Sequence, residues 1–123
     1  KDIIGFEMYI NWDLPLILCE GAFDAMTIKR NAVPLFGKKI SSTLMKKIIK
    51  SNVKKIYLAL DDDALKDALK HAEIFIGYGK RVYFIEMQGK DPSELGFKKF
   101  TKLLHKATEL TTSTLMKKRM ALL

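Results

Sequence analysis

The sequence predicts an α/β fold in which helices cover both faces of an open, mostly parallel sheet of about four strands. Short apolar runs alternate along the chain with longer segments whose apolar residues recur at helical spacing. The runs are apolar at successive positions, which is typical of strands that are buried on both faces. Alternating strands and helices imply right-handed β-α-β crossovers, which make neighbouring strands parallel.

Four segments are predicted as strands because each is a short apolar run bounded by polar or glycine residues. They are Leu14–Cys19, Ala32–Phe36, Lys54–Leu60 and Lys80–Met87. The first residues, Lys1–Trp12, also favour a strand, although their pattern is irregular, and Asn11-Trp12-Asp13 predicts a turn.

The segments between and after these strands predict helices. They are Phe23–Arg30, Ser41–Asn52, Ala64–Tyr78 and Asp91–Ala107. Ser41 is a favourable helix start, and Asp91 and Glu94 have the spacing of a capping box. The tail, Thr111–Leu123, is interpreted as a terminal helix or as a linker whose apolar face needs a partner.

The composition fits one globular domain of ordinary size, with 123 residues of which 48% are hydrophobic. We expect a flanking segment at 1–13, the domain at 14–110 and a helix or linker at 111–123. The only cysteine, Cys19, lies in an apolar run, which excludes an internal disulfide and favours a core thiol in a reducing compartment. The net charge of +8 favours a polyanionic partner such as nucleic acid.

No part of the sequence resembles a membrane span or a leader. No apolar run approaches the roughly 20 residues that cross a bilayer, and no charged-then-apolar leader opens the chain. Because the chain begins at Lys1, we interpret it as a fragment of a longer protein, and we expect it in the cytoplasm, without contact to a membrane.

Acidic residues follow three of the predicted strands. Glu20 ends one strand, Asp61 to Asp63 end another, and Asp91 lies in the loop after the fourth. In open α/β sheets the ligand site lies beyond the carboxyl ends of the strands, so these carboxylates should meet at one edge. In extended chain Asp61 and Asp63 point the same way and Asp62 points elsewhere. Carboxylate oxygens alone suit Mg²⁺ or Mn²⁺.

Several of these acids also have a purely structural interpretation. The three aspartates can form a polar loop with a helix cap, and Asp91 can serve only as a cap. Asp24 can serve only as a first-turn acid that favours the helix dipole. Glu20 is harder to explain structurally, because a carboxylate that closes an apolar strand has few structural uses.

Four motifs together give the sequence a specific resemblance. They are Leu16-Ile17-Leu18-Cys19-Glu20-Gly21-Ala22-Phe23-Asp24-Ala25, Leu35-Phe36-Gly37, Leu58-Ala59-Leu60-Asp61-Asp62-Asp63 and Gly89-Lys90-Asp91-Pro92. This set resembles the Toprim domain, over about residues 14 to 97, and is most similar to the form in bacterial and phage replicative DNA primases. The Glu-Gly-x-x-Asp and Lys-Asp-Pro forms favour primases over topoisomerases.

The resemblance implies a Toprim-type sheet and a metal-dependent phosphoryl-transfer site. Asp61 and Asp63 match the family's metal-binding Asp-x-Asp pair, and Asp91 matches a further acidic position. Glu20 matches the family's glutamate, a general acid or base or a metal ligand depending on the member, and Asp24 matches the acid that follows it in primases. Glu20, Asp61 and Asp63 are therefore the expected catalytic residues, and all five acids are expected metal ligands.

The implied function is metal-dependent nucleotidyl transfer in RNA primer synthesis during DNA replication. The implied cofactor is Mg²⁺ (or Mn²⁺), and the implied partners are a DNA template, nucleoside triphosphates and a replicative helicase or fused helicase domain, in a bacterium or a phage-infected cell. The fragment alone is expected to be incomplete as an enzyme.

Three lysines are candidate phosphate or nucleic-acid contacts, and one of them marks a departure from the family. Lys38 lies just beyond a strand end and Lys90 lies beside Asp91. Lys66 stands near the position where the family usually has a glycine after the Asp-x-Asp pair, so it is either harmless on an exposed turn or alters the metal site.

Three other functions remain open. A Toprim-family nuclease would use similar carboxylates to hydrolyse phosphodiesters. A non-catalytic nucleic-acid-binding module would keep the acidic edge only structurally. A phosphoacceptor receiver domain ranks last, because it needs an acidic pair after its first strand, where this chain has only Glu20.

Overall fold

The computed structural model describes residues 10–28, 31–36, 39–87 and 89–122. The elements, in chain order, are β1 (Leu16–Cys19), α2 (Ala22–Ile28), β2 (Ala32–Pro34), α3 (Ser42–Lys50), β3 (Lys55–Ala59), α4 (Asp62–Gly77), β4 (Arg81–Phe84), α5 (Pro92–Leu95), α6 (Phe97–His105), β5 (Thr108–Leu110) and α7 (Thr112–Ala121). The strand considered for Lys1–Trp12 falls almost entirely outside the described residues. The predicted turn is present, with the Leu14 amide donating to the Asn11 carbonyl at 3.3 Å.

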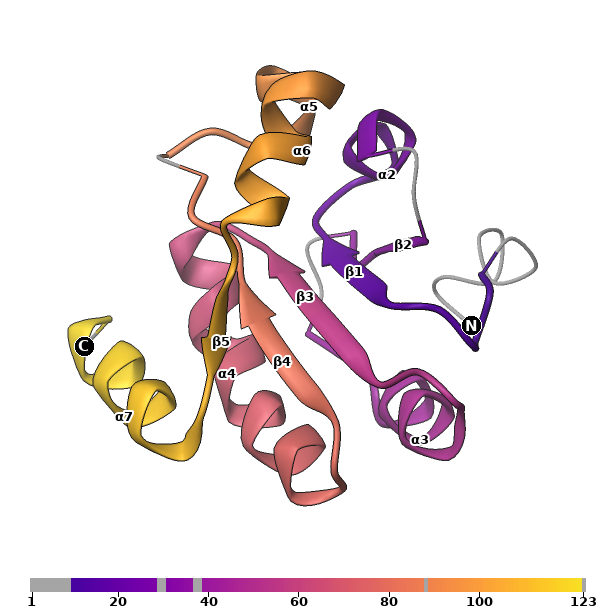
Figure 1. The fold of residues 1–123 in the computed structure, drawn as a ribbon, viewed down its shortest axis with the longest axis vertical. Coiled ribbons are helices and arrows are strands. Elements are labelled where there is room, and N and C mark those ends of the chain that lie inside the picture. The colour runs from indigo at the N-terminus through magenta and orange to yellow at the C-terminus, as the bar shows by residue number, and fades with distance from the viewer. Residues whose placement is uncertain (1–9, 29–30, 37–38, 88, 123) are drawn as a thin grey trace.

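One five-stranded sheet runs through the domain in the order β2-β1-β3-β4-β5 (Figure 1). The first four strands are parallel and β5 is antiparallel to β4, so the prediction of a mostly parallel sheet is confirmed.

The fifth strand corrects the expected number of about four. Thr108–Leu110 pairs with β4, with Leu110 opposite Val82 and Thr108 opposite Phe84. Three residues are too few to show a strand pattern in the sequence, so pairing with a neighbouring strand decides this element.

Helices cover both faces of the sheet, as predicted. On one face, side chains of α3, α4 and α7 pack with alternate strand residues, for example Leu16, Leu58 and Val82. On the other face, α2 and α6 pack against Ile17, Ala59 and neighbouring residues. Figure 1 shows α5 and α6 beyond the arrowheads of β3 and β4, which are the carboxyl ends of those strands.

Polar side chains begin most of the longer helices. The side chains of Ser41, Asp61 and Thr111 each accept a hydrogen bond from the third backbone amide that follows, at the starts of α3, α4 and α7. The tail is thus a helix and not a linker, and its Leu115 is buried in the sheet core. The domain boundaries at 13/14 and 110/111 stay a prediction.

Within the described ranges, no helix combines the length and the apolar character that crossing a membrane requires.

Candidate active site

The sheet reverses its direction of growth between β1 and β3. From β1 the chain moves outward to β2, returns through α3 to the other side of β1 as β3, and then continues to β4. Crevices of open α/β sheets form at such a switch point, beyond the carboxyl ends of the two strands. Glu20 directly follows β1, and Asp61 comes two residues after the end of β3. The Asp61 amide donates to Glu20 Oε2 at 2.9 Å, so the switch point is bridged by the predicted site residues themselves.

Two adjacent grooves open at this edge. The larger has a volume of about 520 Å³ and the smaller about 270 Å³. Three carboxylates, those of Glu20, Asp61 and Asp63, line both grooves. The larger groove is also lined by Asp24, Leu60, Asp62, Phe84, Ile85, Glu86, Met87, Gly89, Lys90, Asp91 and Glu94. The structure therefore brings together the acids that were predicted from three separate segments.

The local geometry of the three aspartates differs from the extended chain that the sequence suggested. Asp61 is the N-cap of α4, with its Oδ1 accepting from the Ala64 amide at 2.9 Å, and Asp62 and Asp63 occupy the first helical turn. Asp62 was expected to point away from Asp61 and Asp63, but it lines the larger groove together with them. The helix starts early because acids are favourable at the positive end of its dipole.

Asp24 is held by two backbone amides. Its Oδ2 accepts from the Gly21 amide at 3.2 Å and its Oδ1 accepts from the Ser93 amide at 3.1 Å. The side chain is only 6% exposed. Both carboxylate oxygens are thus engaged by the protein, and the side chain ties the start of α2 to the start of α5, although it was predicted as a metal ligand.

Asp91 combines the two interpretations that the sequence left open. It is the N-cap of α5, where its Oδ1 accepts from the Glu94 amide at 2.9 Å and from Ser93 Oγ at 2.8 Å. The Glu94 side chain completes the capping box by accepting from the Asp91 amide at 3.0 Å. Because Asp91 also lines the larger groove, the cap aims a carboxylate at the site.

The site is electrostatically unfavourable for anions. Partial burial is the largest cause that raises the pKa of Glu20 above its usual value, and the charges of Asp61 and Asp24 raise it further, while the bond from the Asp61 amide lowers it. Because the pKa of Glu20 is raised in the folded protein, the contribution of protonated Glu20 to the free energy of unfolding is lost as the pH rises through that pKa. A cation at this edge would offset the same repulsion at neutral pH.

Cys19, at the end of β1, is an inert neighbour of the site. The side chain is fully buried, and this burial raises the pKa of the thiol, with smaller contributions from the charges of Asp24 and Glu20. The prediction of a core thiol is confirmed.

Basic residues border the grooves on two sides. Lys90 lines the larger groove, as the sequence suggested, and Lys39 lines the smaller one, with its Nζ 3.9 Å from Asp67 Oδ1. Lys39 was missed, although its neighbour Lys38 was chosen; Lys38 lies outside the described residues. Among the acids, sequence reasoning also missed Glu86 and Asp67, because nothing in the local pattern separates them from ordinary surface residues, and it assigned Glu94 only to a helix cap.

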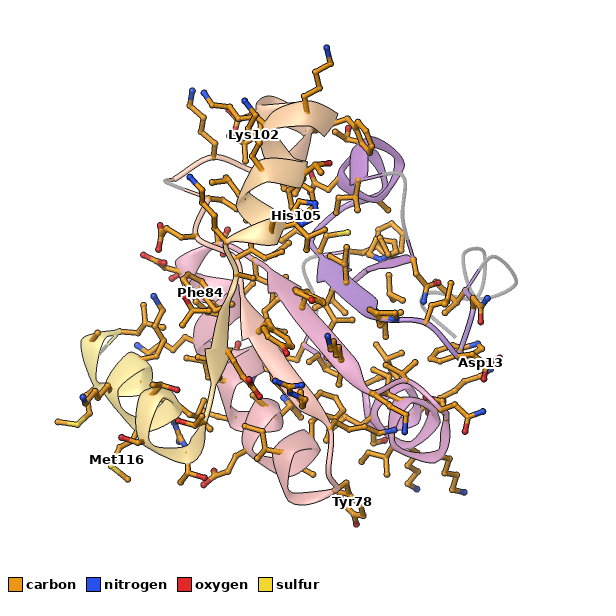
Figure 2. The ribbon with its side chains drawn as sticks, in the orientation of Figure 1. Asp13, Tyr78, Phe84, Lys102, His105 and Met116 are labelled. Carbon is orange, nitrogen blue, oxygen red and sulfur yellow. The ribbon has the colours of Figure 1, made fainter. Side chains whose placement is uncertain are left out.

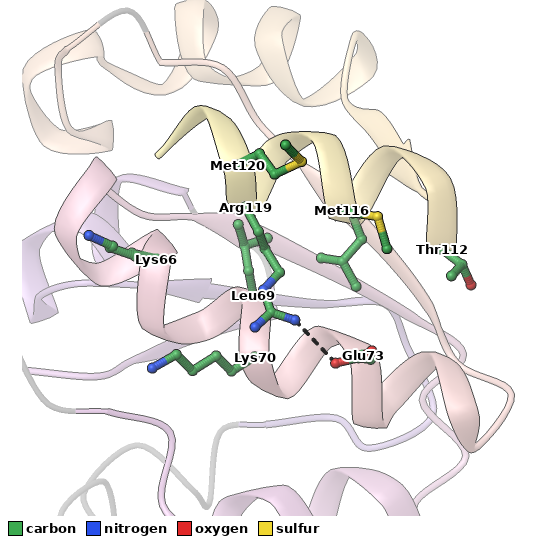
Figure 3. Close-up of a pocket in the computed structure, with 9 residues that line it drawn as sticks. Lys66, Leu69, Lys70, Glu73, Thr112, Met116, Arg119 and Met120 are labelled. Atoms are coloured by element: carbon green, nitrogen blue, oxygen red, sulfur yellow. Dashed lines mark hydrogen bonds and ion pairs between the residues drawn. The ribbon is translucent and has the colours of Figure 1, made fainter. Parts of the chain in front are cut away.

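Lys66 lines neither of the two acidic grooves. It lines a separate, largely apolar groove between α4 and α7, together with Lys70, Leu69 and Met120 (Figure 3). In that groove Arg119 Nη1 donates to Glu73 Oε1 at 3.2 Å. The structure thus does not bring Lys66 into the same groove as Lys90, and Lys38 lies outside the described residues.

The donor set at the acidic edge fits a hard divalent cation. All candidate ligands are carboxylate oxygens, and neither histidine nor accessible cysteine competes with them. In the described part of the chain, no three such groups are close enough together to hold an ion by themselves. Mg²⁺ commonly takes only one or two carboxylates and completes its shell with water and substrate phosphates, so the residues fit such a cation.

The chain belongs to the Toprim-like family, which matches it over residues 17–95. Among solved structures, it is similar to the crystal structure of the zinc-binding and RNA polymerase domains of the Aquifex aeolicus primase, with a TM-score of 0.63 and 21% identity. That match covers 94% of this chain and 32% of the primase chain, so this chain spans about a third of it. No curated protein matches the sequence.

Proposed function

We propose that this chain is the Toprim domain of a bacterial or phage-type DNA primase, and that it binds Mg²⁺ or Mn²⁺ for nucleotidyl transfer in RNA primer synthesis. The observation that carries the proposal is the convergence of Glu20, Asp61 and Asp63 on two grooves at the switch point of a Toprim-like sheet. The similarity to the fold of a primase supports the choice of primase among Toprim functions. The expected partners are a DNA template, nucleoside triphosphates and a helicase, in the bacterial cytoplasm.

The residues divide the work at this edge. Asp61 and Asp63, with Glu20 beside them, would hold the cation, and Asp91 would extend the acidic surface along the larger groove. A bound divalent cation would neutralise charge on the phosphates of a nucleotide and activate the attacking hydroxyl. Glu20, whose carboxylate accepts from the Asp61 amide, would exchange a proton in the same groove. Lys90 and Lys39 would contact phosphate at the rims.

A calorimetric titration with Mn²⁺ tests the metal site. The parent chain is compared with an Asp61→Asn/Asp63→Asn variant, in which asparagine still caps α4. We expect the parent to bind and the variant to lose at least about tenfold in affinity, or ~1.4 kcal/mol. An Asp13→Asn/Glu73→Gln variant loses the same number of carboxylates outside the two grooves, and it should bind like the parent.

Equal binding by all three proteins would contradict the metal site, and so would absence of binding in the presence of a nucleoside triphosphate. Which reaction of the Toprim family this domain supports is tested by activity assays on the longer protein that contains it. Ribonucleotide incorporation on a DNA template supports the primase, whereas strand cleavage without incorporation would assign a nuclease. Nucleic-acid binding without any need for a divalent cation and without either reaction would assign a non-catalytic module.

A further inference from the structure

Helix α6 has one apolar face and one strongly basic face. Phe100 on its inner side is completely buried. Its exposed positions carry a cluster of lysines that we call the α6 lysine face, which consists of Lys98, Lys99, Lys102 and Lys106. No aspartate or glutamate occurs between Leu95 and Thr108. The face is therefore positive without internal compensation.

The lysines are aligned along the helix. Lys98, Lys102 and Lys106 are four residues apart, which places them on one side with a rise of about 6 Å between successive positions. Among the residues that the structure describes, none of these side chains takes part in an ion pair. Such a row presents several unpaired cations to one extended ligand. Exposure of the lysines to water would not by itself require them to lie in a row.

Helix α6, which carries the α6 lysine face, begins at the same edge of the sheet as the acidic grooves. Helix α6 starts directly after α5, whose cap Asp91 lines the larger groove, and its end leads into Thr108, opposite Phe84 at the carboxyl end of β4. The start of α6 and the start of β5 thus lie at the carboxyl edge, whereas Leu104 near the end of α6 lines a groove with residues that precede β1. Figure 2 labels Lys102 and His105 on this helix.

Other lysines of the chain lie elsewhere. Lys46 and Lys50 are on α3, and Lys54 directly precedes β3, so this second exposed group belongs to the amino end of the central strand. Its three exposed lysines match in number the three aligned on α6, but the group lies toward the opposite end of the strand from the acidic grooves, and it therefore provides a matched comparison.

Resting on the function proposed above, we propose that the α6 lysine face binds the sugar-phosphate backbone of a single-stranded nucleic acid that enters the acidic grooves. Without a cation the grooves repel phosphate, so the strand needs a positive surface next to them. A single strand can bend from α6 into the groove within a few nucleotides, whereas a duplex is stiff over roughly 150 base pairs. This contact needs no divalent cation, and so it is separable from the proposed metal site.

The test measures binding of a fluorescent oligothymidine in EDTA over a series of salt concentrations. The Lys98→Gln/Lys102→Gln/Lys106→Gln variant is compared with the parent and with the control Lys46→Gln/Lys50→Gln/Lys54→Gln, which has the same net charge. Each lost phosphate contact should reduce the slope of log K against log salt by about 0.7. We expect the α6 variant to lose up to about 2 in slope and at least about tenfold in low-salt affinity, and the control to lose less than about threefold.

Equal losses in the two variants would overturn the proposal, because they would show a response to net charge alone. Unchanged binding by the α6 variant, or displacement of the oligothymidine from the parent by poly-glutamate at an equal charge concentration, would also overturn it. Circular dichroism checks folding, and a Lys98→Gln/Lys102→Gln pair replaces the triple variant if that one unfolds. Mn²⁺ titration of the α6 variant should match the parent, which keeps this proposal distinct from that for the metal site.

Discussion

Asp24 shows that a residue of a site motif can have a mainly structural role. One of its carboxylate oxygens accepts from the amide of Gly21, and the other accepts from the amide of Ser93, which lies 69 residues further along the chain. A buried carboxylate with both oxygens engaged holds the α2 and α5 starts together. The motif position predicted from the resemblance is therefore needed to shape the groove even where it does not contact a cation.

Substitution at Asp24 separates the structural role from a ligand role. Asp24→Ala leaves two partly buried amides without acceptors, so we expect the free energy of unfolding to fall by about 1–3 kcal/mol. Asp24→Asn keeps one acceptor oxygen, so its free energy of unfolding should lie between that of Asp24→Ala and that of the parent. Urea unfolding measures both variants. A fully stable Asp24→Asn variant that no longer binds Mn²⁺ would instead make Asp24 a metal ligand, as the sequence suggested.

At the scale of the element, the start of α4 has two roles that different substitutions distinguish. Asp61 caps the helix through Ala64 and also lines both grooves. Asp61→Ala removes the cap and should lower the free energy of unfolding by about 0.5–2 kcal/mol, while Asp61→Asn keeps the cap and should change it little. Both changes should weaken Mn²⁺ binding to a similar degree. Unfolding curves and calorimetry on the two variants check this, and equal stability of the two would exclude the capping role.

Elements with their own local signals could be predicted from the sequence. Ser41 starts α3, and the Asp91–Glu94 capping box starts α5, because side-chain caps act within four residues. The edge on which the acids meet also followed from the alternation of strands and helices. In contrast, β5 depends on pairing with β4 from 24 or more residues away, and no local pattern encodes it.

The fine geometry of the site was less predictable than its location. The extended interpretation of Asp61 to Asp63 was wrong, because the helix begins at Asp62 as soon as Asp61 caps it. Which carboxylate oxygens stay available also depends on partners far along the chain, such as Ser93 for Asp24. Lys66 and Lys39 show the same limit, since the groove that each lysine lines is set by packing between elements.

At the scale of the whole molecule, the helices that border the site differ in length, and therefore in how stable each would be without tertiary contacts. The acidic grooves are bordered by the start of α4, a helix of 16 residues, and also by two short helices, α2 with 7 residues and α5 with 4. Helices that short are marginal alone and depend on their tertiary contacts. Local opening should therefore begin at α2 and α5, the short helices that border the site.

Hydrogen exchange followed by mass spectrometry tests this expectation and links it to the proposed metal site. Without a cation, backbone amides of α2 and α5 should exchange faster than those in the middle of α4. Mn²⁺ at about 100 times its dissociation constant stabilises the closed form by about 2.7 kcal/mol, so exchange by openings that break the site should slow by up to about 100-fold. The slowing should be concentrated in the segments that carry Glu20 and Asp91, because opening of α3 leaves the acidic edge largely intact. If the cation slowed amide exchange equally in α3 and α5, this would contradict separate opening of α2 and α5. It would mean that the cation stabilises the domain only against global unfolding.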